Sequence, residues 1–179
     1  LTERPVPEKV ELTIDKGKYW SMVEEDVDRF QSDYKYIDDW TRDASEQLKI
    51  TVETQVLGDI YADAAAANAG LTAGAKSASY NLGSAGTPFT IDKTNVLDYI
   101  INLSSVLDEQ NVPDEGRWAI FPIWMFGMIL KSDLKDASLS GDTTSIMRNG
   151  RAGMIGNMML YRSNLLDVVG GNTNIIAGH

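Results

Sequence analysis

The sequence contains no cysteine, and its one histidine is the last residue, His179. The absence of cysteine excludes disulfides, zinc–thiolate centres and thiol nucleophiles. A Ser-His-Asp triad, a two-histidine metal site or a histidine base would all have to be built at the chain end. A catalytic histidine needs a rigid surround, which a terminal residue rarely has. We therefore expect no histidine- or cysteine-based catalysis and no metal site of these types.

Long hydrophobic runs and clustered basic residues are also lacking. The longest apolar stretch, Trp118–Phe126, is much shorter than the ~20 residues that a bilayer requires. Sixteen basic residues stand against 26 acidic ones, which gives a net charge of −10. Proteins that bind DNA or RNA directly usually carry a clustered basic face, and none is visible here. The sequence therefore predicts neither a membrane span nor a specific nucleic-acid contact.

The acidic charge is concentrated in residues 21–43, which hold eight acidic and three basic residues, a local net charge of −5. A solvated helix face with an acidic first turn explains this stretch. A calcium site is the alternative, but the spacing fits no EF-hand loop because no Asp-x-Asp-x-Asp-Gly run with a distal Glu is present.

The length of 179 residues suits about one domain, and 43% hydrophobic and 23% charged residues are typical of a globular protein. Val10–Ile14 alternates apolar and polar residues, which predicts a strand. From Trp40 to Ala64 an apolar or small residue recurs at every fourth position, which predicts an amphipathic helix over 38–67, ~45 Å long. Its expected core side is Leu48, Val52, Val56 and Ile60, and Glu46, Lys49 and Glu53 face away.

Residues 68–87 are rich in glycine and serine and predict a loop. Within it, Gly70–Ser77 is a near miss for a phosphate-binding loop, because Ala75 stands where the motif needs glycine and no strand precedes it. Gly150, Gly153 and Gly156 likewise lack the strand and the Gly-x-Gly start of a dinucleotide fingerprint, and close backbone packing explains them better. We therefore expect no nucleotide site.

The second half of the chain mixes helices and strands, so the predicted fold class is α+β. A helix capped by Thr94 runs to Gln110, with Leu97, Ile100, Ile101, Leu103, Ser104 and Leu107 on its apolar side. A buried strand follows over 117–121, with Trp118 and Phe121 in the core, and Pro122 opens a helix that ends near Leu130. A polar loop over 132–145, a turn at Asn149–Gly150, and strands over 154–160 and 175–176 complete the chain.

Several segments, taken in order, resemble tailed-bacteriophage major capsid proteins of the Hong Kong 97-type shell fold. The helix end Leu-Asp-x-x-Asn-Val-Pro at 107–113, followed by Arg117 and an apolar strand that ends in Pro122, is similar to a signature of that family. Gly153–Gly156 and Tyr-x-Ser-Asn at 161–164 are similar to its glycine-rich strand and strand ending. Residues 10–20 and 26–31 resemble the strand that enters the long helix and the acidic start of that helix.

The resemblance implies an architecture. Residues 1–20 would be the returning strand of an extended loop, and 21–91 a peripheral domain with a spine helix and a hairpin loop. Residues 92–179 would form a mixed α/β axial domain. The sequence is expected to be a core piece of the subunit, without the N-terminal arm, most of the extended loop and the C-terminal strands, and to be monomeric or weakly associated by itself.

The resemblance also implies a function: a structural subunit that self-assembles into the icosahedral shell around the DNA genome of a phage or prophage. Its partners would be copies of itself in hexamers and pentamers, together with scaffolding and portal proteins. It would lie in the virion capsid, and in the host bacterial cytoplasm during assembly, with no membrane, cofactor, metal or enzymatic activity. Candidate structural and assembly residues are Glu46, Lys49, Glu53, Gly58, Asn111, Pro113, Arg117, Trp118, Pro122, Tyr161 and Asn164.

Two alternatives stay open. One is the shell of a related non-viral nanocompartment. The other is an enzyme that uses paired carboxylates such as Asp108 and Glu109, or Asp114 and Glu115, but a general acid needs an apolar pocket that the sequence does not reveal. For Gly58, inside the predicted helix, both a bend needed for changes of shell curvature and simple close packing are open.

Overall fold

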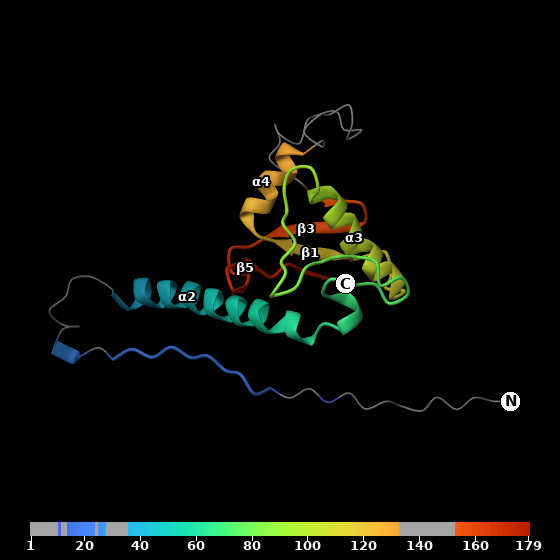
Figure 1. The fold of residues 1–179 in the computed structure, drawn as a ribbon. Helices are drawn as coiled ribbons and strands as arrows, with labels where there is room; N and C mark the ends of the chain where they lie inside the picture. The colour runs from blue at the N-terminus through green and yellow to red at the C-terminus, as the bar shows by residue number, and fades with distance from the viewer. Residues whose placement is uncertain (1–10, 12–13, 24, 28–35, 133–152) are drawn as a thin grey trace. The chain divides into compact units, whose positions relative to one another are not determined.

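The computed structural model describes residues 11, 14–23, 25–27, 36–132 and 153–179 (Figure 1). The chain divides into two compact units, residues 1–52 and 53–179. Most of the predicted strand Val10–Ile14, nearly all of the predicted loop 132–145 and the predicted turn Asn149–Gly150 lie outside the described residues.

The long helix α2 spans Tyr36–Asp59, 24 residues, and is shorter than the sequence predicts. Beyond it the chain continues as two 3₁₀ turns, η1 over Ile60–Asp63 and η2 over Ala66–Asn68. Tertiary hydrogen bonds explain the early end. The Tyr61 hydroxyl donates to Asp167, the Ala67 carbonyl accepts from the Gly74 amide, and the Asn68 carboxamide accepts from Gln110. These contacts override the helix propensity of the alanine-rich segment.

Three of the four residues on the predicted core side of α2 are exposed, and the fourth, Leu48, is half-buried. Val52, Val56 and Ile60 are 45%, 52% and 43% exposed, and only Ala44 on this side is buried. The periodicity identifies the apolar face correctly, but the described part of the chain does not cover it. The expectation that this face forms the core of the chain is therefore wrong.

The sheet of the second unit has the strand order β2-β3-β1-β6. β1, Trp118–Phe121, runs parallel to β3, Met158–Arg162, and antiparallel to β6, Ile176–Gly178. Figure 1 shows β1 and β3 side by side near α3 and α4. The strand predicted over 154–160 is instead a hairpin of β2, Met154–Ile155, and β3, because Gly156 takes a left-handed φ of 60° and turns the chain. The sequence analysis misses the hairpin of β4, Val168–Val169, and β5, Asn172–Thr173.

The core lies between this sheet and two helices, α3 at Val96–Glu109 and α4 at Ile123–Lys131. α3 buries residues at three- and four-residue spacing, and α4 buries Met125 and Ile129, four residues apart. Pro122 is itself buried and immediately precedes α4, as predicted. Within the apolar side predicted for α3, Ile100, Leu103 and Leu107 are buried, but Ile101 is 54% exposed. The fully buried core residues include Ile100, Phe121, Met125, Ile129 and Met158.

Two local predictions are wrong in detail. Strand alternation turns Ala119 and Phe121 to the core and leaves Trp118 half-buried on the other side, where its indole packs against Gly178. The residue at the N-cap of α3 is Asn95 rather than Thr94. In the turn just before the helix, the Asp92 carboxylate accepts from the Thr94 and Asn95 amides at 2.7 and 3.1 Å. An Asp side chain commonly stabilises such a turn by bonding to amides two and three residues on.

Candidate functional site

The segment that carries the resemblance forms a tight junction between α3 and β1. Asn111 adopts a left-handed φ of 56° just after the helix. Its amide donates to the Asp108 carbonyl at 2.9 Å, and the Val112 amide donates to the Leu107 carbonyl at 3.2 Å. This pair of bonds is a Schellman motif, in which a left-handed residue, most often Gly or Asn, ends the helix. The backbone conformation therefore favours Asn or Gly at position 111.

The buried side chain of Arg117 stabilises this junction. Its side chain is 1% exposed, and its guanidinium forms ion pairs with Asp108 at 2.6 Å and Asp114 at 2.9 Å. Nε donates to the Pro113 carbonyl at 2.9 Å, and Nη2 donates to the Val112 carbonyl at 2.6 Å. The planar guanidinium thus binds two loop carbonyls, a helix carboxylate and a loop carboxylate at once, which a lysine could not do.

The structure explains the spacing Asn-Val-Pro-x-x-x-Arg in physical terms. Asn111 turns the chain out of α3, and the next two residues present their carbonyls to Arg117, which immediately precedes β1. The geometry brings together Asn111, Pro113 and Arg117 and fixes the angle at which the helix meets the sheet. It is a structural device, and it occupies the carboxylates of Asp108 and Asp114.

The loop that nearly matches a phosphate-binding motif already binds an anion of the chain itself. Oε2 of Glu109, at the end of α3, accepts from the Lys76 amide at 2.8 Å and the Ser77 amide at 3.0 Å. Hydrogen bonds from the Ser77 side chain and from these two amides lower the pKa of Glu109. The Lys76 and Ser77 amides, which a phosphate would need, therefore already have an acceptor.

The carboxylate-enzyme alternative finds no support in this geometry. Asp108 and Asp114 pair with Arg117, and Glu109 holds a loop. The pKa of Asp92, like that of Glu109, is lowered, in this case first by the Thr94 hydroxyl. A general acid needs a raised pKa. Among the described residues no group of His, Cys, Asp and Glu side chains could hold a metal ion.

The remaining sequence candidates lie on separate elements. Glu46 and Lys49 form an exposed i,i+3 ion pair at 2.7 Å, and Glu53 is exposed on the same helix. Tyr161 points outward from β3 and is 56% exposed, and Asn164 is exposed after that strand. The structure does not bring these residues into one site.

Gly58 lies one residue before the end of α2, so it is not in the helix interior. A methyl group added there would meet no atom within 4 Å in the described part of the chain. No described residue therefore packs closely around Gly58, contrary to that expectation.

Two features of the structure are not predicted from the sequence. Tyr61 after α2 donates to Asp167 at 3.1 Å, a bond that raises the pKa of Tyr61. The second unit also has an open, largely apolar groove of about 1170 Å³ beside β6, lined by Ile60, Trp118 and Trp124 among others. Both features join residues more than 50 positions apart, and no local sequence pattern predicts such contacts.

No described helix is long and apolar enough to cross a membrane.

The comparison with known proteins is consistent with the fold. A solved chain of Mycobacterium phage Che8 is similar, with a TM-score of 0.61 at 22% sequence identity. The similarity covers 88% of this chain and 51% of that one, so the sequence spans about half of that protein's length. No curated protein matches the chain.

A family model, phage capsid protein, matches residues 7–178, which is almost the whole sequence. The mixed helix and sheet architecture, with a long helix and a sheet packed on two shorter ones, agrees with the α+β shell fold that the sequence predicts. The chain belongs to the phage capsid protein family and is a structural capsid protein.

Proposed function

We propose that this chain forms the central part of a shell subunit that associates with copies of itself in rings of five and six, and that it catalyses no reaction. The observation that carries the proposal is the exposed apolar stripe of Val52, Val56 and Ile60. Burying a Val or Ile side chain contributes roughly 1.5–3 kcal/mol, so three on one face are costly to leave in water. Exposed apolar faces of this kind typically mark protein–protein contacts.

Family membership supplies the occupant of this face. A capsid protein functions by contact with its own copies, and closed rings need the same surfaces repeated in every subunit. In this proposal residues 1–20 belong to an extended loop, 21–91 to a peripheral domain and 92–179 to an axial domain. Glu46, Lys49, Glu53, Tyr161 and Asn164, all exposed, are the polar residues available at subunit contacts. Scaffolding and portal proteins complete the list of partners, and assembly takes place in the cytoplasm of the bacterial host.

The test is electron microscopy of the full-length protein, expressed alone and with its phage neighbours. Val56→Glu should prevent closed shells or rings, while circular dichroism stays unchanged because Val56 is 52% exposed. Gln47→Glu is the matched control. It adds the same charge to the same helix nine positions earlier, half a turn away from Val56 at about 100° per residue.

Normal shells from Val56→Glu would show that the stripe is not a subunit contact. Absence of any ring or shell from the unmodified protein, with or without its phage neighbours, would overturn the proposal as a whole.

A further inference from the structure

The four-stranded sheet of the second unit is apolar on both faces. Directly paired residues point to the same face of a sheet, and neighbours along a strand point to opposite faces. Ala119 and Phe121 of β1 face the core, as do Met158 and Leu160 of β3. The opposite face, which we call the open face, carries two apolar rows that cross the strands. The first row is Met154, Met159 and Trp118, and the second is Tyr161, Ile120 and Ile176.

Much of the open face is exposed in the described part of the chain. Met154 is 59% exposed, Met159 38% and Tyr161 56%, while Trp118 and Ile120 are half-buried. A solvated sheet face normally carries polar side chains, whereas a sheet with parallel strands is usually covered on both faces. β1 and β3 are parallel, and neither row contains a charged residue. The open face therefore has the composition of a surface that is covered in the assembled protein.

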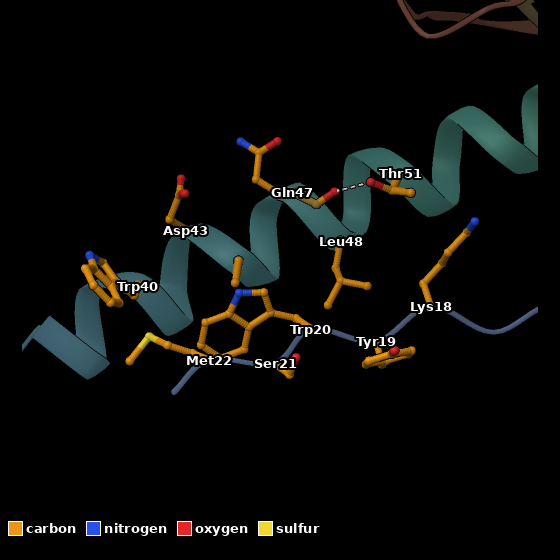
Figure 2. Close-up of a pocket in the computed structure, with 11 residues that line it drawn as sticks. Lys18, Tyr19, Trp20, Ser21, Met22, Trp40, Asp43, Gln47, Leu48 and Thr51 are labelled. Carbon is orange, nitrogen blue, oxygen red and sulfur yellow. Dashed lines mark hydrogen bonds between the residues drawn. The ribbon is translucent and has the colours of Figure 1, made fainter. Parts of the chain in front are cut away.

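The exposed stripe of α2 matches the open face in size and chemistry. Figure 2 shows Leu48 pointing toward the segment Lys18–Met22, so the uncovered part of the stripe begins at Val52. From Val52 to Ile60 it extends about 12 Å at 1.5 Å per residue. Four strands about 4.8 Å apart give the open face a width of about 14 Å. An apolar helix stripe on an apolar sheet face is a common pair of packed layers.

Charge favours the same pairing. Over residues 46–59, α2 carries three acidic residues and one basic residue, which are Glu46, Glu53, Asp59 and Lys49. The four strands of the sheet carry one charged residue, Arg162, which is exposed at the end of β3. A helix that lies on the open face thus brings a net negative charge to a surface whose one charge is positive.

Symmetry selects a second copy as the source of this helix. A stripe in contact with an identical stripe gives an isologous pair, which closes as a dimer. A helix face that binds a sheet face is a heterologous contact, and heterologous contacts close rings. Rings of five and six therefore require two different surfaces on each subunit, and the stripe and the open face are two such surfaces.

We propose that the open face of one subunit binds the Val52–Ile60 stripe of a neighbouring copy. This contact rests on the ring assembly proposed above and adds the surface that receives the stripe. Val56 and Ile60 of one copy lie against Met159 and Tyr161 of the next, and Arg162 faces the acidic residues of α2.

Chemical cross-linking tests the pairing directly, because this sequence contains no cysteine. Val56→Cys and Met159→Cys are made in separate full-length chains, in which any cysteine outside these 179 residues is replaced by serine. The two chains are assembled together and treated with a short bismaleimide. We expect at least tenfold more cross-linked dimer from the mixture than from either variant alone. Gln47→Cys in place of Val56→Cys is the matched control, since Gln47 points away from Leu48 (Figure 2) and lies half a turn from Val56.

A charge on the open face gives a second readout. Met159→Glu should reduce the yield of rings and shells in electron microscopy at least tenfold, with unchanged circular dichroism because Met159 lies outside the core. Ile101→Glu is the control, since Ile101 is 54% exposed on α3 and belongs to neither surface. It should leave the yield unchanged.

The outcomes separate this contact from the ring assembly itself. Normal shells from Met159→Glu, or equal cross-linking through Gln47→Cys and Val56→Cys, would overturn the contact and leave ring assembly standing. A dimer from Val56→Cys alone would show that the stripe meets another stripe instead. Cross-linking inside a chain that carries both cysteines, with none between singly substituted chains, would show that the stripe covers the open face of its own copy.

Discussion

Replacing Arg117 by Lys separates two roles of the buried arginine, charge and shape. The guanidinium reaches two carboxylates and the carbonyls of Val112 and Pro113 through three nitrogens. A lysine keeps the positive charge but has one nitrogen, so it cannot bind all four groups. Arg117→Met removes both the charge and the hydrogen bonds while it keeps most of the apolar stem.

The expected magnitudes follow from burial. An unpaired buried polar group costs about 1–3 kcal/mol, and Arg117→Met leaves two loop carbonyls without their donor. We expect a loss of about 3 kcal/mol for Arg117→Met and about 2 kcal/mol for Arg117→Lys. Asp114→Asn should change stability by less than about 0.5 kcal/mol, because the Asp114 side chain is 78% exposed.

The assay is urea unfolding followed by far-ultraviolet circular dichroism, with the midpoint and slope both fitted. If Arg117→Lys is as stable as the unmodified chain within about 0.5 kcal/mol, the planar fork has no special role and charge alone suffices. If Arg117→Met is equally stable, the junction does not depend on the arginine at all, as happens where a buried ion pair is replaced by apolar groups at no loss.

Four further outcomes are expected. Asn111→Gly should keep or slightly raise stability, and Asn111→Ala should lower it by about 1 kcal/mol in urea unfolding, since a left-handed φ disfavours side chains that cannot bond locally; equal effects would refute this. Because the pKa of Glu109 is lowered, its contribution to stability is complete above the ordinary carboxyl pKa and is lost as pH falls through the lowered value; the protection of the Ser77 amide, relative to its intrinsic exchange rate, should fall there, and Glu109→Gln should remove that pH dependence. Trp118→Ala should lower the free energy of unfolding by about 1.5–3 kcal/mol in the same assay, which is less than the ~3–5 kcal/mol expected for a fully buried aromatic. A loss above about 4 kcal/mol would show that the indole lies in the core. Gly58→Ala should stabilise the chain by up to about 1 kcal/mol in thermal unfolding, and full-length shells that form but no longer change curvature, seen by electron microscopy, would support a bend there.

The sequence predicts best where local rules and burial agree. β1 and α4 follow from an apolar run interrupted by Pro122, and both are found within a residue or two of the expected bounds. The exit of α3 follows from the Asn-Val-Pro segment. In these places turn chemistry, periodicity and the core all favour one structure.

Prediction fails where the deciding contact is distant or depends on one backbone angle. The left-handed Gly156 divides one predicted strand into two, and pattern alone does not distinguish it from a glycine inside a strand. The partners of Arg117 are a helix carboxylate and loop carbonyls, which no periodicity marks. The end of α2 depends on Tyr61, whose partner Asp167 is 106 residues away.

The prediction for the apolar stripe of α2 fails in a different way. The periodicity identifies the apolar face correctly, but the expectation that this face is buried is wrong. Amphipathic spacing states which face of a helix avoids water, but it does not state whether the same chain or another one covers that face. Val52 and Val56 satisfy the spacing and remain about half exposed. In the assembly proposed above, this mismatch between periodicity and burial locates a surface for subunit contact. The apolar residues of α2 that the described part of the chain leaves exposed are the first place to test for neighbouring subunits.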